Sequence, residues 1–354
     1  MNLTKLIAQM TIFTVCRQML ARVLLFLLSV GYVVPALAVE EFATFIFEND
    51  VFTDDSDDGY TNGMGYAWGR AGFNEFDDSN TPGWIQWLSD DLYISTMPAK
   101  RRAITYQVFQ TITTPTDRDT SKLQPDDYPY AGTLTWKVTQ YAIDNAVTDT
   151  VSLLLGAVGP VSLAEQAQDL VHELTDSTDP QGWDNQLNNE PLFQLGAGRK
   201  WRLLDGNISG GTDYDVIPAV EGTVGNLSSN ADAGVTFRFG TDLLRTYPVA
   251  SLWPAREVNP MTGTAAGNYY VFVSVMGRYQ ANNIIIDGNS SAFDDDNNSD
   301  LTLENGQNFV AAGFAVSFKS WSLIFSAVSA SKDFEENDDD RYSFGSLSVS
   351  WTVD

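Results

Sequence analysis

Residues 309–318 read FVAAGFAVSF, and their side chains alternate between two kinds of surface. One face carries an apolar row, which consists of Val310, Ala312, Phe314, Val316 and Phe318. The opposite face carries small residues, among them Gly313 and Ser317. This alternation over about ten positions is typical of a membrane β-barrel wall, although the strand of a soluble β-sandwich gives the same pattern. The stretch therefore predicts a strand and leaves both folds open.

The same period of two recurs along the chain. In residues 131–141, AGTLTWKVTQY, one face carries Leu134, Trp136, Val138 and, less cleanly, Gln140. We expect strands near 41–49, 60–70, 102–114, 131–143, 148–158, 191–204, 213–226, 230–240, 267–281, 305–318, 321–334 and 341–353. Twelve is an even number, as a closed bacterial barrel requires. The sequence thus predicts an all-β fold, a twelve-stranded antiparallel up-and-down transmembrane β-barrel, with Trp68, Trp136 and Trp351 as wall or girdle residues.

The first 38 residues have the pattern of a signal peptide, with early basic residues, an apolar core and the small-residue site Ala36-Leu37-Ala38. We expect cleavage there, which would leave residues 39–354 as one barrel domain. Cys16 is the only cysteine, so the exported protein would contain no disulfide. After this segment no apolar run reaches the ~18 residues of a membrane helix.

The chain is strongly acidic, with a formal net charge of -26. The predicted signal peptide carries three basic residues and no acidic one, so its removal changes the charge from -26 to -29. Such a charge argues against a nucleic-acid partner, because polyanions repel it. It is instead expected to gather divalent cations.

Strand parity predicts which connections share a side of the membrane. If both termini are periplasmic, the odd-numbered connections are extracellular. The acidic stretches 53–58, 294–300 and 335–340 then all lie on the outer side. The long connection 71–101 lies on the periplasmic side, and its sequence PGWIQWLSDDL predicts a short interfacial helix with Trp84, Trp87 and Leu88 on one face.

The extracellular connection 159–190 predicts a helix on the outer side. Ser162-Leu163-Ala164-Glu165 has the form of a capping box, so we expect the helix to begin at Ser162 and to run to about Leu174. Its predicted apolar stripe comprises Ala164, Ala167, Val171 and Leu174, and Gln168 and His172 lie one turn apart on another face.

His172 is the only histidine of the protein. Histidine is the one side chain whose unperturbed pKa, about 6.5, lets it accept a proton near neutral pH. Base catalysis here would therefore use His172. The sequence lacks a G-x-S-x-G motif, and a single histidine without cysteine gives no support for a zinc site.

Residues 45–63, FIFENDVFTDDSDDGYTNG, place a cluster of oxygen-bearing side chains between the first two predicted strands. Ca²⁺ binds six to eight oxygen atoms from carboxylates, amides, backbone carbonyls and water, so Asn49 and Asp50 are candidate ligands. The stretch lacks the twelfth-position glutamate of an EF-hand. A strand-end turn is the competing interpretation, because Asn and Asp are common there.

Five motifs in order give a specific resemblance: FENDVF, YTNG, PYAG at 129–132, VGPVSLAEQAQDLVHEL at 158–174 and GWDNQL at 182–187. Together the motifs resemble the lipid A deacylase family, the LpxR-type outer-membrane 3-O-deacylases, over essentially the whole mature chain. The resemblance implies a twelve-stranded barrel in the outer membrane and a calcium-dependent hydrolase. Its substrate would be lipid A of lipopolysaccharide, from which it removes the 3′-acyloxyacyl group in the outer leaflet.

The resemblance also implies roles for individual residues. The catalytic histidine corresponds to His172, the helix glutamine to Gln168 and the hydroxyl residue that opens the second strand to Thr61. The family's Asn-Asp pair corresponds to Asn49 and Asp50, with Asp50 and Asn49 as calcium ligands. His172 would activate a water that attacks the ester carbonyl, and the cation would polarise that carbonyl.

Two departures and two alternatives remain at this point. A family lysine has no clean counterpart, and Lys122 and Arg118 are the nearest candidates. The chain also ends in WTVD rather than in a terminal aromatic residue. An outer-membrane phospholipase or esterase with the same chemistry and a non-catalytic, porin-like barrel are the alternatives, and a monomer is expected in each case.

Overall fold

The computed structural model describes residues 40–353, apart from 51–58, 99, 176–177, 209–210, 245, 247–266, 294–300 and 319. The side chains of residues 40, 59–61 and 174–175 are also outside the description. The predicted signal peptide and two of the three acidic stretches, 53–58 and 294–300, therefore lie outside the described residues.

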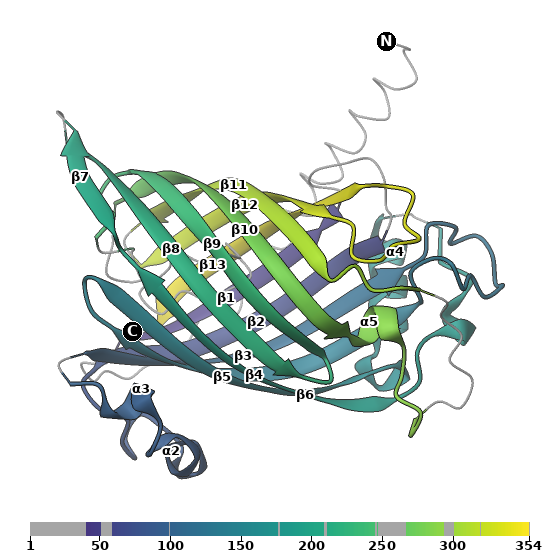
Figure 1. The fold of residues 1–354 in the computed structure, drawn as a ribbon, viewed down its shortest axis with the longest axis horizontal. Helices are drawn as coiled ribbons and strands as arrows, with labels where there is room; N and C mark the ends of the chain where they lie inside the picture. Colours follow the sequence, from purple (N-terminus) through teal and green to yellow (C-terminus); the bar gives the residue numbers. More distant parts are fainter. Residues whose placement is uncertain are drawn as a thin grey trace.

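The described strands form one antiparallel sheet that closes on itself (Figure 1). They are β1 (Glu40–Asn49), β2 (Gly59–Phe73), β3 (Arg101–Thr114), β4 (Ala131–Ile143), β5 (Val147–Val158), β6 (Glu190–Trp201), β7 (Leu204–Ile208), β8 (Thr212–Gly225), β9 (Ser228–Gly240), β10 (Tyr269–Asn283), β11 (Gly306–Phe318), β12 (Trp321–Ser331) and β13 (Arg341–Val353). Because β1 pairs with β13 and β6 pairs with β8, twelve strands complete the barrel. This confirms the predicted twelve-stranded fold.

The predicted strand 191–204 is the one that differs most from the structure. It becomes β6 and the short β7, which both pair with β8. β7 pairs with the first half of β8 and extends that hairpin beyond the wall (Figure 1). The break at Arg202 and Leu203 coincides with an ion pair from Arg202 Nε to Asp215 Oδ2 at 3.4 Å.

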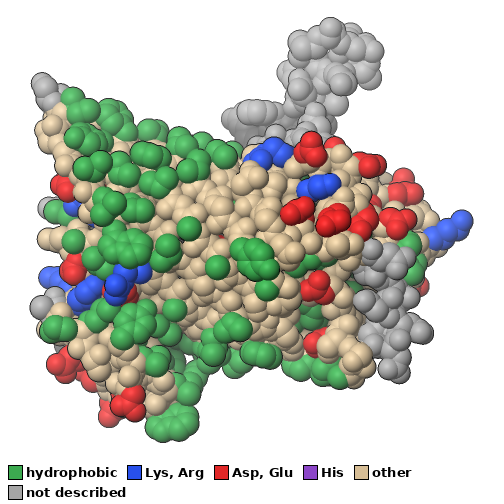
Figure 2. All heavy atoms as spheres, viewed as in Figure 1, with side chains coloured by type: hydrophobic (Ala, Val, Ile, Leu, Met, Phe, Trp, Pro, Cys, Tyr) green, Lys and Arg blue, Asp and Glu red, His purple; other side chains and the backbone are tan. Residues whose placement is uncertain are grey.

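The apolar row of 309–318 lies on the outer face of the barrel. Val310, Phe314 and Phe318 are 43%, 42% and 51% exposed, whereas the intervening Ala311 and Ala315 are buried. Figure 2 shows hydrophobic side chains along the outer wall. Apolar side chains that point out of a closed antiparallel wall are those of a membrane barrel, because lipid covers them.

The interior is filled by small polar and apolar side chains. Thr44 Oγ1 lies 2.8 Å from Ser350 Oγ, and Ser346 Oγ donates to Glu48 Oε1 at 2.8 Å. A cavity of about 340 Å³ remains in the lumen, and its lining includes Lys137. Pairing satisfies these buried polar groups, as an interior away from bulk water requires.

The two ends of the barrel carry different helices (Figure 1). α4 (Ala164–Thr175) and α5 (Ile284–Asp287) lie at one end, and α2 (Gly83–Ser89) and α3 (Tyr93–Thr96) lie at the other. The acidic stretch 335–340 connects β12 to β13 at the α4 end, as the predicted topology requires. No helix in the described part of the chain is long and apolar enough to span a membrane.

A small apolar cap covers the lumen at the α4 end. Tyr128, Ile286 and Phe334 are buried together, and the Tyr128 and Phe334 rings meet edge to face with centroids 4.8 Å apart. The Tyr128 hydroxyl donates to the Asp333 carboxylate. Burial raises the pKa of Asp333 to about 6. The cap thus contains a carboxyl group that is easier to protonate than an ordinary aspartate.

This raised pKa predicts a pH dependence of stability. The folded protein binds the Asp333 proton more tightly than the unfolded chain, so the stability from this group is greatest below about pH 4 and declines as pH rises through 6. Asp333→Asn should flatten the decline, measured as the difference in denaturation midpoint between pH 4 and pH 7.5. Asp339→Asn, at an exposed position of the same connection, is the control. An unchanged decline in Asp333→Asn would contradict this assignment.

Candidate active site on the outer wall

α4 packs against the outer face of the barrel wall. Side chains that line the lumen alternate along β3 and β4 with side chains that face out, and Gln110, Ile112 and Gly132 belong to the outward set. Gln110 Nε2 donates to the Ser162 carbonyl oxygen at 2.6 Å, and Ile112 is buried against Ala164. The helix therefore lies on the lipid side of the wall and outside the lumen.

Gly132 is the point of closest approach between the wall and the start of α4. A Cβ atom at this position would meet Ala164 Cβ and Ser162 Oγ at well under 3.0 Å, a separation that real Cβ atoms essentially never show. The glycine is required here because it lets the helix approach the strand so closely.

The predicted capping box at Ser162 is wrong. Residues Pro160–Ser162 form a 3₁₀ turn (η2), Leu163 has a left-handed backbone with φ 57°, and α4 begins at Ala164. Ser162 Oγ has no hydrogen-bond partner among the described residues. The chain turns sharply at Leu163 because the preceding residues are fixed to the wall through Gln110.

The buried face of α4 is partly polar. Ala164, Gln168 and His172 are spaced by four residues and are 1%, 3% and 9% exposed. Residues at this spacing lie on one helix face. The predicted stripe was therefore incomplete, because Gln168 and His172 share the buried face with Ala164. Two polar side chains are thus held between a helix and a barrel wall.

The hydrogen bond of His172 defines its tautomer. Nδ1 lies 2.7 Å from the carbonyl oxygen of Thr178. A carbonyl oxygen only accepts, so Nδ1 carries the hydrogen, and the neutral ring has its lone pair at Nε2. The Asp179 carboxylate lies 3.9 Å from Nδ1 but is 61% exposed, so solvent screens it. His172 is therefore arranged to accept a proton at Nε2.

Gln168 is held by a tryptophan from the GWDNQL motif. Trp183, in the 3₁₀ turn η3 (Trp183–Asn185), is buried and donates from Nε1 to Gln168 Oε1 at 2.9 Å. Its ring lies 5.1 Å from the Tyr130 ring, centroid to centroid. Because Oε1 accepts this bond, the orientation of the Gln168 amide group is fixed. Its nitrogen Nε2, which is a donor, has no partner among the described residues. Gln168 thus offers an oriented donor.

The strand ends place Asn49 on the same outer face. Asn49 pairs with Asn62, Asn62 with Ile112 and Ile112 with Gly132, so these residues form one outward row across four strands. The row ends at the residue against which α4 packs. The register therefore brings Asn49 to the level of the helix on the lipid side of the wall.

Asp50 and Thr61 complete the set of predicted site residues. Asp50 follows directly after β1 and is 2% exposed. Thr61 lies in β2 at the irregularity between Tyr60 and Asn62, and its side chain is outside the described part. The structure thus places all five predicted residues at the α4 end of the barrel.

The sequence did not identify the residues whose hydrogen bonds position the start of α4 and the predicted side chains Gln168 and His172. Gln110, Trp183 and Thr178 bond to Ser162, Gln168 and His172 through contacts between distant segments. Only the GWDNQL motif signalled one of these, Trp183. No local pattern marks the other two, because a strand glutamine and a loop carbonyl have no sequence signature.

The connection between β3 and β4 also borders the site. The Gln181 amide donates to the Arg118 carbonyl oxygen at 2.9 Å, and Asn185 Nδ2 donates to the Ser121 carbonyl oxygen at 3.0 Å. The segment with Arg118 and Lys122 is therefore fixed to the one that holds His172 and Gln168. Arg118 is half-buried and Lys122 exposed. The two basic side chains that could stand for the family lysine therefore both lie in the connection between β3 and β4.

The donor atoms of the strand end suit a hard cation. Among the described residues no three His, Cys, Asp or Glu side chains gather as a metal site. Asp50 and Asn49 supply a buried carboxylate and an amide, and such oxygen donors favour Ca²⁺ over Zn²⁺. A cation here would take its other ligands from backbone carbonyls and water.

Comparisons with known proteins identify the family of the chain and solved structures with a similar fold. The family profile described as "Outer membrane protein LpxR" matches residues 23–353. Among solved structures, the chain is similar to LpxR from Salmonella typhimurium, with a TM-score of 0.69 and 15% identity over 88% of this chain and 100% of that chain. The β-domain of the Bordetella autotransporter BrkA gives a TM-score of 0.44 at 9% identity, over 90% of this chain and 100% of that chain. No curated protein sequence matches significantly.

Proposed function

The chain belongs to the LpxR family of outer-membrane proteins, and from this premise we propose that it is a lipid A deacylase. The proposed reaction is hydrolysis of the ester that holds the 3′-acyloxyacyl group of lipid A in the outer leaflet. This places the α4 end of the barrel at the cell surface.

The position of His172 is the observation that carries this proposal. The residue lies on the buried face of α4, and α4 lies on the lipid side of the wall rather than in the lumen. A lipid in the surrounding leaflet can reach such a site laterally, whereas a solute in the lumen cannot. The geometry thus favours a lipid substrate over a channel function.

The proposed mechanism uses His172 as general base. Nε2 accepts a proton from a water molecule, which attacks the ester carbonyl carbon, while Nδ1–H remains bonded to the Thr178 carbonyl. The tetrahedral intermediate then collapses: the bond between the carbonyl carbon and the 3′ sugar oxygen breaks, and Nε2–H returns the proton to that leaving oxygen. The Gln168 amide Nε2, oriented by Trp183, donates to the water or to the substrate. Asn49 and Thr61 orient water or substrate from the strand ends.

Calcium is part of the proposal. Asp50 and Asn49 would hold the cation, and Ca²⁺ would supply positive charge that polarises the ester carbonyl and offsets the negative charge of lipid A phosphates. Arg118 and Lys122, in the connection fixed to the site, are the candidates for direct phosphate contact.

Loss of the Trp183–Gln168 hydrogen bond should lower activity moderately. Trp183→Phe keeps an aromatic ring next to Tyr130 but removes the Nε1 donor to Gln168 Oε1. One neutral hydrogen bond contributes about 0.5–1.5 kcal/mol, so we expect kcat to fall roughly 3- to 10-fold with little change in KM. A rise in KM at unchanged kcat would instead assign Gln168 to substrate binding alone.

The substrate class can be tested with purified protein. The detergent-solubilised barrel is incubated with hexa-acylated lipid A or with a diacyl phospholipid, and released acyl chains are identified by mass spectrometry. We expect release of the 3′-acyloxyacyl chain from lipid A. Release from the phospholipid alone would reassign the protein as a phospholipase, and release from neither, by correctly folded protein, would contradict an esterase.

A further inference from the structure

The connection of residues 74–100 packs on the outer wall at the end of the barrel opposite α4 (Figure 1). Ile85 of α2 is buried against Ile104 and Val138, which face out from β3 and β4. The two short helices therefore occupy a place beside the wall that membrane lipid would otherwise fill.

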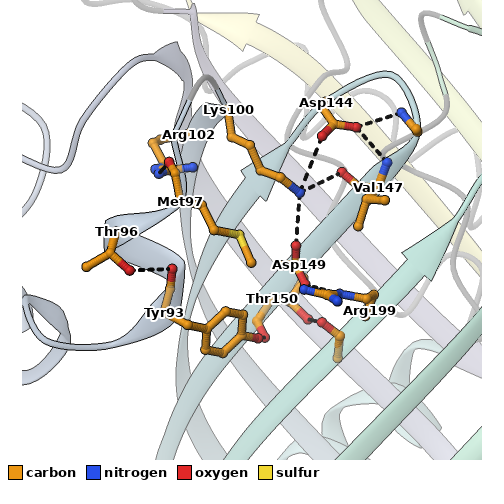
Figure 3. A network of polar contacts seen from close by, with 12 residues as sticks. Tyr93, Thr96, Met97, Lys100, Arg102, Asp144, Val147, Asp149, Thr150 and Arg199 are labelled. Atoms are coloured by element: carbon orange, nitrogen blue, oxygen red, sulfur yellow. Dashed lines mark hydrogen bonds and ion pairs between the residues drawn. The ribbon is translucent and has the colours of Figure 1, made fainter.

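This connection provides partners for outward-facing polar groups of the wall (Figure 3). Arg102 Nη2 donates to the Met97 carbonyl oxygen at 2.5 Å, and Gln140 Nε2 donates to Ser89 Oγ at 3.1 Å. Asp149, 1% exposed as a side chain, accepts from Lys100 Nζ at 3.0 Å and from Arg199 Nε at 2.5 Å.

Bare contact between these groups and hydrocarbon would be costly, because lipid offers them no hydrogen-bond partner. The connection covers these polar groups and presents its own side chains to the lipid in their place. The predicted face of α2 is indeed turned outward: Trp84, Trp87 and Leu88 are 48%, 79% and 50% exposed. Leu92 and Tyr93 continue this apolar surface at 38% and 43% exposure.

A row of aromatic rings joins this surface to the wall. It runs through Trp351, Tyr66, Trp68, Tyr106, Trp136 and Trp84, with neighbouring centroids 5.7 to 6.4 Å apart. The row confirms Trp68, Trp136 and Trp351 as wall residues. Aromatic residues of barrels gather at the membrane interface. Trp84 therefore extends this aromatic row of the outer wall onto α2.

We propose that residues 74–100 form an interfacial wedge, which inserts Trp84, Trp87 and Leu88 into the phospholipid leaflet at the end of the barrel opposite α4. The connection contains five acidic residues and one basic residue, a net charge of -4. Attraction to anionic headgroups therefore does not hold it there. Burial of its apolar side chains holds the connection at the membrane, so a zwitterionic phospholipid surface is enough for binding.

The wedge can be tested with single spin labels in phosphatidylcholine nanodiscs. Cys16→Ser removes the only cysteine, and Trp87→Cys then carries a nitroxide on the exposed face of α2. Asp91→Cys labels an exposed polar position of the same connection, and Val108→Cys labels the outer wall. Should Trp87→Cys fail to insert, Leu88→Cys replaces it.

Collision rates with oxygen, which partitions into lipid, and with a water-soluble nickel chelate decide the outcome. We expect the label at 87 to match the label at 108, with oxygen favoured, and the label at 91 to favour nickel. Nickel access at 87 equal to that at 91 would place the face in water and overturn the wedge. Dipolar broadening at 87, with protection from both agents, would mean a second copy covers the face and would also overturn it.

Discussion

Replacement of His172 by alanine is expected to lower the rate of lipid A ester hydrolysis by about 10²–10⁴-fold, the usual contribution of a general base. The expected loss is in kcat, because the imidazole acts on the attacking water and does not hold the acyl chains. The measurement is acyl-chain release from hexa-acylated lipid A by purified, folded protein.

Glu173→Ala is the matched control for this variant. Glu173 follows His172 on α4 but is exposed, so its removal should leave hydrolysis nearly unchanged. Heat-modifiable mobility of the barrel on gels verifies folding in both variants. Hydrolysis by His172→Ala at the wild-type rate would exclude the histidine as base and with it the proposed mechanism.

A single methyl group at Gly132 is expected to reduce activity by roughly 100-fold. The new Cβ would collide with Ala164 Cβ and Ser162 Oγ, so α4 must move away from the wall. A displacement of about 1 Å in the reacting groups can cost 10²-fold in rate. The strands pair as before, so the barrel should still insert.

Gly277→Ala is the control for this substitution. Gly277 lies in β10, and a Cβ atom there meets nothing within 4 Å. Gly277→Ala should therefore insert and hydrolyse lipid A like the wild type. Equal activity of the two alanine variants would show that the contact between α4 and Gly132 does not position the site.

The barrel could be predicted from the sequence because its signal is repeated and local. Each wall strand alternates between lipid and interior, so rows such as Val310, Phe314 and Phe318 are visible in ten residues. Helical spacing, an equally local pattern, identified the exposed face of α2. The division of the predicted strand 191–204 into β6 and β7 is not visible in its own residues. It depends on pairing with β8, which lies later in the chain.

The site could be predicted only in part. The single histidine and the motif order marked His172 and Gln168, but helical periodicity alone assigned them to a face away from Ala164. The position of α4 is set by Gln110, Gly132 and the left-handed Leu163. These contacts join segments that are distant in sequence. They hold Ser162 in a 3₁₀ turn, so the capping box predicted at Ser162 does not form and α4 begins at Ala164.

Mass spectrometry of lipid A tests the central claim most directly. Wild-type protein and His172→Ala are expressed in an outer membrane that carries hexa-acylated lipid A, with and without a calcium chelator. We predict loss of the 3′-acyloxyacyl mass with wild type alone, and none with the variant or with chelator. Unchanged lipid A in cells with correctly inserted wild-type protein would contradict the account, and lysophospholipid in its place would identify a phospholipase.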